Sequence, residues 1–107
     1  MLLTDKKKYS LLLPPGQVGG SGAVRILEVG SRGDDVKELQ TFLREEGSYP
    51  NGRVTGYFGP LTKKAVQRFQ NKYRAEILTP NGFKSATGMV GSATRKKIND
   101  LLGSQNS

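Results

Sequence analysis

The sequence contains few side chains that could do covalent chemistry. Its 107 residues include neither His nor Cys, which excludes disulfides, thiolate catalysis and Cys/His zinc sites, and removes the usual general base of a nucleophilic triad. The adjacent carboxylates of Asp34 and Asp35 fall in the expected first turn of a helix, where the helix dipole stabilises negative charge. We therefore predict that the chain is not an enzyme and holds no metal or cofactor.

The remaining candidates are groups that bind rather than react. The net charge is +8, and residues 48–107 hold ten basic and two acidic residues, whereas residues 31–47 hold three basic and five acidic ones. A cationic half favours an anionic partner, such as nucleic acid, a membrane surface or an acidic cell-wall polymer, although it also simply keeps a protein soluble. The basic side chains expected on this face are Lys63, Lys64, Arg68, Lys72, Arg95, Lys96 and Lys97.

One pattern occurs twice, 32 residues apart. The first copy, TGYFGPLTKKAVQRF, begins at Thr55, and the second, TGMVGSATRKKINDL, begins at Thr87. In each copy two glycines frame a tight turn, and a threonine (Thr62 or Thr94) follows near the third position of a helix, where its hydroxyl can bond within the first helical turn. The repeat indicates that one turn-plus-helix unit is used twice.

Between its two glycines, each copy carries two larger residues that have different expected environments. Phe58 and Val90 are expected to point into the core, and Tyr57 and Met89 are expected at the rim. An aromatic ring on a turn can stack on a sugar or pack against a peptide, or it can be a half-buried structural residue. We expect the first copy to face a ligand through Tyr57, and the second mainly to close the core.

The elements that must position these turns are predicted to be three short helices, at residues 32–46, 60–73 and 92–102. Each range has apolar residues at spacings of three and four, as an amphipathic helix requires. The residues expected to face inward are Val36, Leu39, Phe42, Leu43, Leu61, Ala65, Val66, Phe69, Tyr73, Ala93, Ile98, Leu101 and Leu102. Residues 74–86 are expected to be an irregular connector, so the fold class is all-α, a compact three-helix bundle.

The helix ends have recognisable signals. Ser31 is the expected N-cap of the first helix, with Asp34 three residues later as in a capping box, and Gly47 is its expected C-terminal stop. Gly59 is the expected N-cap of the second helix, directly before Pro60 at the first helical position. Gly103 is the expected stop of the third helix.

These signals divide the chain into a domain at residues 25–103, a flexible tail or linker at residues 1–24 and a C-terminal tail at residues 104–107. The basic-then-apolar start is similar to a signal peptide, but its apolar run, Leu11–Leu13, is shorter than the usual 7–15 residues and is followed by two prolines. We therefore predict no signal peptide and no membrane span.

Several spaced motifs together resemble the peptidoglycan-binding domain family, a small three-helix module appended to many bacterial and phage cell-wall hydrolases. They are DDVKELQ from Asp34, FGPLT from Phe58 and AVQRFQ from Ala65, and the match runs from about Ile26 to Leu102. The connector from Lys72 to Thr87 is longer than the typical loop of the family.

The resemblance implies a non-catalytic module of the cell envelope or extracellular space that tethers a linked hydrolase or other envelope protein to the wall. Its ligand would be the stem peptide of peptidoglycan with adjoining glycan, in a shallow groove beside the second helix and the turn before it. We expect the module to be a monomer. The candidate ligand-binding residues are Tyr57, Thr62, Arg68, Gln40 and Lys64.

Two of these candidates have a specific expected role. Arg68 lies one turn beyond Lys64 and could bind a carboxylate through two parallel hydrogen bonds. Gln40 interrupts an apolar stripe beside Leu39, so its amide is expected to bind either a loop backbone or the ligand.

Two further functions compete with wall binding. The charge of +8 suits a basic helical module that binds nucleic acid or another anionic polymer, but the turns between the expected helices are too long for a helix-turn-helix. The pro-regions of animal matrix metalloproteases resemble this fold and use a Cys to block a catalytic zinc, a device that a chain without Cys does not have.

Overall fold

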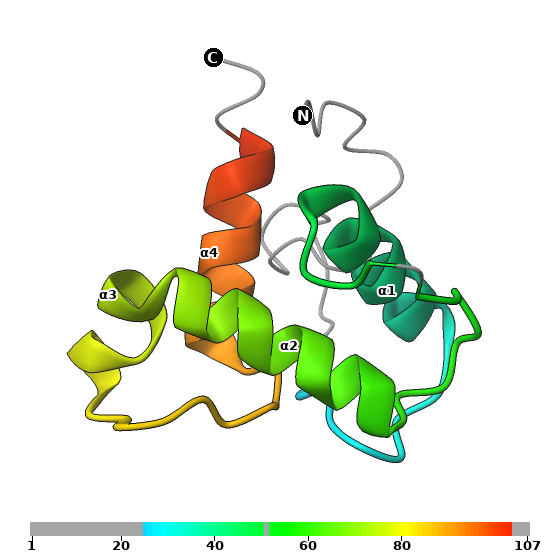
Figure 1. Cartoon of the computed structure of the whole chain (residues 1–107), viewed down its shortest axis with the longest axis horizontal. Coiled ribbons are helices and arrows are strands. Elements are labelled where there is room, and N and C mark those ends of the chain that lie inside the picture. The colour runs from blue at the N-terminus through cyan, green and yellow to red at the C-terminus, as the bar shows by residue number, and fades with distance from the viewer. Residues whose placement is uncertain (1–24, 51, 104–107) are drawn as a thin grey trace.

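The computed structural model describes residues 25–50 and 52–103, and this part of the chain is helical. Both predicted tails, residues 1–24 and 104–107, lie outside the described residues. The elements in order are α1 (Asp34–Glu46), α2 (Pro60–Lys72), α3 (Arg74–Ile77), the 3₁₀ turn η3 (Thr79–Asn81) and α4 (Ser92–Gly103). Figure 1 shows α2 passing in front of α4, with α1 on the opposite side of the molecule from α3.

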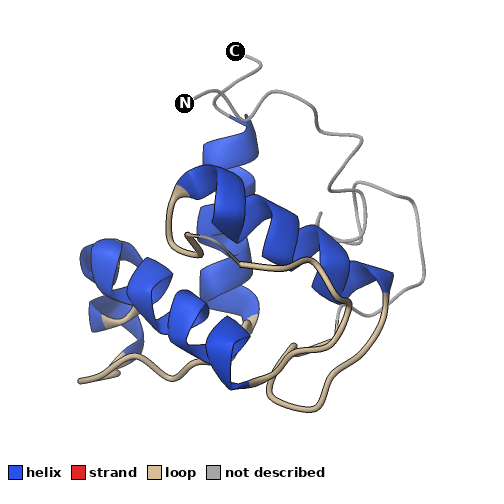
Figure 2. Cartoon of the chain, turned by 45° about the vertical axis from the view of Figure 1, so that its right-hand side comes forward, coloured by secondary structure: helices blue, strands red, loops and turns tan. Residues whose placement is uncertain are grey.

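The predicted all-α class is confirmed, but the bundle is not limited to three helices. The connector expected to be irregular contains α3 and η3, because Ile77 and the following Leu78 are both fully buried and anchor a helical turn against the core. Gly82 ends η3 in the left-handed conformation, with its N–H bonded to the carbonyl of Thr79. Figure 2 shows helices joined by loops, and in the described ranges β-pairing is limited to two isolated bridges.

The predicted start of α1 is wrong by two residues. The N-cap is Gly33, not Ser31, and no side chain caps the helix. Ser31 instead accepts a hydrogen bond from the backbone N–H of Glu28 through its Oγ, because it lies in the turn that leads into the helix. The predicted stop at Gly47 is confirmed, since this residue is left-handed and its N–H reaches the carbonyls of Leu43 and Arg44.

The ends of the other two long helices agree closely with prediction. Gly59 is the N-cap of α2 and Pro60 occupies its first turn, and the helix ends one residue before the expected Tyr73. The last helix, α4, has Gly103 as its final described residue, one residue beyond the expected last helical position, Leu102.

The core lies where the predicted stripes meet. Its fully buried large side chains are Leu27, Leu39, Phe42, Leu43, Phe58, Phe69, Ile77, Leu78, Ile98 and Leu102. Phe42 and Phe69 meet edge to face, with ring centroids 5.5 Å apart, so α1 and α2 share one aromatic contact. The prediction that Leu61 faces inward is wrong, because its side chain is 68% exposed, whereas the next residue, Thr62, is almost completely buried.

The lead-in segment (residues 25–33) connects the two copies of the repeat. Leu27 pairs with Val90 through reciprocal backbone hydrogen bonds, and Arg32 forms an antiparallel bridge with Tyr57. Leu27 and Val90 are fully buried. The lead-in segment therefore holds both glycine-framed turns against the same core.

Candidate functional site

A buried glutamine holds the first turn (residues 55–59). Gln40 Oε1 accepts hydrogen bonds from the backbone N–H groups of Thr55 (2.8 Å) and Gly56 (3.0 Å). Its Nε2 donates to the carbonyl of Tyr57 (2.9 Å) and to Oγ1 of Thr62 (3.0 Å). Gln40 is 0% exposed, so in this structure its amide binds the loop backbone, one of the two roles expected for it.

A second glutamine holds the second turn (residues 87–91) in the same way. Gln70 Oε1 accepts from the backbone N–H of Gly88 (2.9 Å), and its Nε2 donates to the carbonyl of Met89 (2.9 Å) and to Oγ1 of Thr94 (3.0 Å). Like Thr62 in the first copy, this threonine accepts its hydrogen bond from another helix. The structural repeat thus includes the preceding helix, and α2 belongs to both copies.

The sequence reasoning singled out Gln40 but missed Gln70. The available signal was a shared pattern, a glutamine directly after a large apolar residue. The preceding residues, Leu39 and Phe69, are both fully buried. A polar residue next to a core position, repeated before both turns, predicts a buried amide that must satisfy its hydrogen bonds with nearby backbone.

The first groove lies in front of the first turn and has a volume of about 330 Å³. Its lining is formed by Tyr49, Gly52, Arg53, Thr55, Tyr57, Gly59, Pro60, Leu61 and Thr62. Tyr57 is 39% exposed, as predicted for a rim residue, and the guanidinium of Arg32 stands over its ring at 4.6 Å from the centroid. The groove therefore combines an accessible aromatic ring with cationic groups, which suits a ligand with both sugar-like and anionic parts.

The predicted site residues occupy three distinct places around this groove. Tyr57 and Thr62 line it, although Thr62 is almost completely buried. Gln40 lies behind it and reaches no surface. Lys64 and Arg68 are exposed on α2 at three and seven positions after Leu61, so the three residues share one face of the helix.

Arg68 already has a partner in this structure, since its Nη1 donates to the carbonyl of Ser48 at 3.2 Å. Ser48 directly precedes Tyr49, a wall of the first groove. The exposed face of α2 therefore runs beside the groove from Leu61 towards Arg68.

The second groove lies beside the second turn and has a volume of about 260 Å³. Its lining is formed by Ile26, Gln70, Ile77, Leu78, Asn81, Phe83, Thr87, Met89, Gly91, Ser92, Ala93 and Thr94. The second copy thus closes the core through Val90, as expected, and also borders a depression next to Met89, which is 42% exposed. Sequence reasoning missed this groove because much of its wall comes from α3, η3 and the loop that follows.

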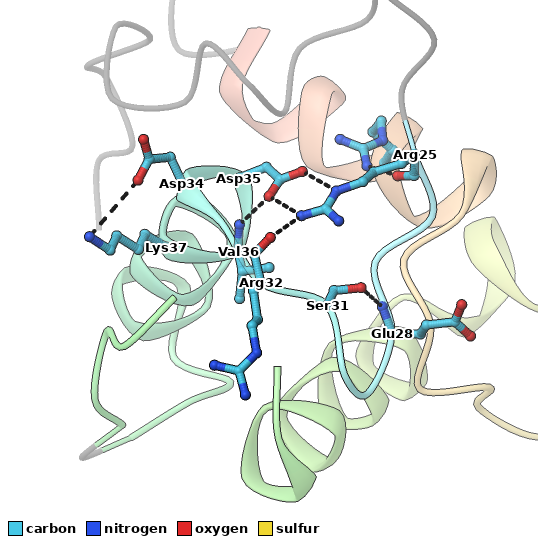
Figure 3. Close-up of polar contacts among 9 residues, drawn as sticks. Arg25, Glu28, Ser31, Arg32, Asp34, Asp35, Val36 and Lys37 are labelled. Carbon is cyan, nitrogen blue, oxygen red and sulfur yellow. Dashed lines mark hydrogen bonds and ion pairs between the residues drawn. The ribbon is translucent and has the colours of Figure 1, made fainter. Parts of the chain in front are cut away.

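Charged side chains fasten the lead-in segment to the helices (Figure 3). Arg25 contacts both carboxylate oxygens of Asp35 at 2.8 Å, and it also donates to the carbonyl of Arg32. This hydrogen-bonded guanidinium holds the pKa of Asp35 below its usual value. Arg95 was expected on the basic face but is only 6% exposed, because its guanidinium turns inward and donates to the carbonyl of Arg25 at 2.8 Å. Burial lowers the pKa of Arg95.

Two other kinds of site are absent from the described residues. No helix in residues 25–50 and 52–103 is long and apolar enough to cross a membrane. Within the same ranges, no three acidic side chains gather closely enough to hold a metal ion.

Comparisons with known proteins match the same part of the chain. Residues 32–98 match the family described as "Putative peptidoglycan binding domain". The chain is 35% identical over 74 residues to the spore cortex-lytic enzyme of Bacillus subtilis (strain 168), a match that covers 69% of this chain and 21% of that protein. It is 40% identical over 78 residues to the zinc D-Ala-D-Ala carboxypeptidase of Streptomyces albus G, covering 70% of this chain and 26% of that protein.

The fold is also similar to a solved structure, the crystal structure of SleB N-terminal domain, with a TM-score of 0.61 and 29% sequence identity. That match covers 77% of this chain and 99% of the solved one. The chain spans about a quarter of the length of the two curated relatives, so the similarity concerns one module of each. The family match includes both glutamine-held turns and most of the three long helices, and the chain belongs to the peptidoglycan-binding domain family.

Proposed function

We propose that this chain binds peptidoglycan through the first groove and the adjoining face of α2, and that it carries out no chemistry of its own. The observation that supports this site most directly is the accessible ring of Tyr57 at the mouth of a groove lined by Arg53, with Arg32 over the ring. Peptidoglycan offers a matching pair of features, a glycan whose faces stack on aromatic rings and a stem peptide that ends in a carboxylate.

The two parts of the ligand would contact different residues. A sugar ring or an apolar part of the peptide would pack on Tyr57 and Leu61, which are both exposed. A stem-peptide carboxylate would meet Arg53 in the groove, or Lys64 and Arg68 along α2. In this proposal Gln40 acts indirectly, because its buried amide fixes the turn that presents Tyr57.

A single small module that binds through a shallow groove would bind weakly and serve mainly as a tether. Its effect would come from raising the local concentration of a linked protein near the wall. The named relatives include a cortex-lytic enzyme and a carboxypeptidase, so a hydrolase of the cell envelope is the kind of linked protein that we propose. The module itself would act as a monomer outside the cytoplasm.

The direct test is co-sedimentation of the purified protein with insoluble sacculi. We expect the wild-type protein to sediment, and Tyr57→Ala to weaken its apparent affinity about tenfold, which corresponds to about 1.4 kcal/mol. Val29→Ala is the matched control, because Val29 is an exposed apolar residue that lines neither groove. A wild-type protein that stays in the supernatant at low salt contradicts wall binding.

The salt dependence of DNA binding distinguishes wall binding from nucleic-acid binding. Three of the basic residues expected on one open face, Lys72, Lys96 and Lys97, form ion pairs with carboxylates of this chain. This pairing favours a local carboxylate contact over a continuous stripe that follows a phosphate backbone. We expect any DNA binding to disappear near physiological salt while wall binding remains.

A further inference from the structure

We propose that the second groove is a separate binding site that takes the N-acetyl groups of the glycan. This inference rests on the proposed wall binding and adds a second contact to it. The first groove would hold the charged and aromatic-stacking part of the ligand, and the second would hold an uncharged methyl-bearing part.

The first argument is that the two grooves are built by the same device. In each, a buried glutamine accepts a hydrogen bond from a turn glycine and donates to the carbonyl of the next residue, Tyr57 or Met89. The same glutamine donates to the threonine at the start of the following helix. Each groove then opens directly over that turn and that helix start. A polymer of repeating units is a natural ligand for a repeated site.

The second argument is the distribution of exposed apolar side chains. Six large hydrophobic residues are exposed in the described part of the chain, and three of them, Ile26, Phe83 and Met89, line the second groove. Two others, Tyr57 and Leu61, line the first. Apolar side chains gathered at a depression, rather than scattered over the surface, indicate a site that is covered when a partner binds.

The third argument is the chemistry of the lining. Among the described residues that line the second groove, none has a charged side chain, although the whole chain carries a net charge of +8. Its inner wall includes Ile77 and Leu78, which are almost fully buried, and its rim includes the side chains of Asn81 and Ser92. An acetamido group fits an apolar inner wall with a polar rim, because its methyl is apolar and its amide needs hydrogen-bonding partners.

The lead-in segment keeps the two turns beside the grooves close together. Leu27 pairs with the second turn and Arg32 with the first, and five residues of chain span at most about 18 Å. In this proposal, a strand that occupies one groove presents further units to the other at a high effective concentration.

The test uses two uncharged oligosaccharides that differ only in the acetamido group. Labelled protein is titrated with chitotetraose, the β-1,4 tetramer of N-acetylglucosamine, and separately with cellotetraose, its counterpart with hydroxyl groups instead. We expect chitotetraose to shift the amide signals of Phe83, Met89 and Ala93, and cellotetraose to leave them unchanged. Equal shifts with both sugars, shifts confined to the first turn, or no shifts overturn the inference.

A pair of variants connects this site to the wall. The double substitution Phe83→Ser and Met89→Ser should remove the chitotetraose shifts and lower the apparent affinity for sacculi at least fivefold, whereas Val29→Ser should leave both unchanged. Both variants alter exposed side chains, and an unaltered thermal transition confirms that they fold. If Tyr57→Ala weakens sedimentation and the double variant does not, wall binding stands and the second site fails. If wild-type protein does not sediment at all, both proposals fail.

Discussion

The two copies of the repeat share a scaffold and differ in what they expose. Behind each turn lies a buried glutamine with nearly the same hydrogen bonds. In front of the first turn are a tyrosine and an arginine, and in front of the second are Met89 and Phe83. The residues that fix the backbone of each turn are therefore different from the residues that line its groove. The groove residues can change while the scaffold stays the same.

The largest expected effect comes from removing the glutamines. Gln40→Ala and Gln70→Ala each leave buried backbone groups without a partner and create a cavity, so each should lower the free energy of unfolding by about 3 kcal/mol or more. Urea denaturation of both variants measures this. If the two copies are equivalent scaffolds, the losses agree within about 1 kcal/mol, and a loss below about 1 kcal/mol for either one breaks the equivalence.

The next largest effect is expected at the turn glycines, where alanine should destabilise the two copies to different extents. Gly56 and Gly88 have φ of 84° and 78°, which costs an alanine about 1–2 kcal/mol. A β-carbon on Gly88 would stand 2.7 Å from Cγ of Lys63, whereas one on Gly56 would stand 3.2 Å from Cε of Lys37. We therefore expect Gly88→Ala to destabilise the protein more than Gly56→Ala in the same denaturation assay, and the reverse order contradicts this reasoning.

A smaller effect is expected from the ion pair that holds the lead-in segment between the grooves. Because the folded pKa of Asp35 is lowered, its contribution to stability is present above its unfolded value near 3.8 and is lost as the pH falls through the lower folded value. Asp35→Asn should therefore reduce the loss of stability below about pH 4. It should also make the melting temperature depend less on salt concentration. Thermal melts across pH 2–6 check this, and an Asp35→Asn profile identical to wild type contradicts it.

The smallest effect on stability, with a clear effect on binding, is expected at Leu61. Its side chain is exposed, so Leu61→Ser should change the free energy of unfolding by less than about 0.5 kcal/mol. It should weaken sedimentation with sacculi a few-fold without altering chitotetraose shifts at the second turn. A change in those shifts would mean that the two grooves are coupled rather than independent.

Much of the framework was predictable because its signals are local. Gly59 and Pro60 marked the start of α2, and Gly47 marked the end of α1, since these residues have special backbone requirements. The inward Phe58 and outward Tyr57 followed from a turn too short to bury both side chains. The candidate site residues could be named for their chemistry, but their roles as ligand contacts remain predictions.

Other features were missed because they depend on distant parts of the chain. Leu61 has the spacing of a core residue, but its side chain is 68% exposed, whereas the adjacent Thr62 is buried against Gln40 of α1. Arg95 looks like a surface cation, but the lead-in segment supplies a carbonyl that draws it inward. The helix α3 has only four residues, too few to be recognised or stable without the core that buries Ile77.

The sequence by itself determined the helical class, the repeat, the family and which residue of each turn faces the core, because these depend on local spacing and on backbone preference. Only the tertiary structure decided that Gln40 and Gln70 act as matched buried anchors and that each repeat opens into its own groove. Those properties arise where segments distant in the chain meet, and burial then dictates which polar groups must find one another.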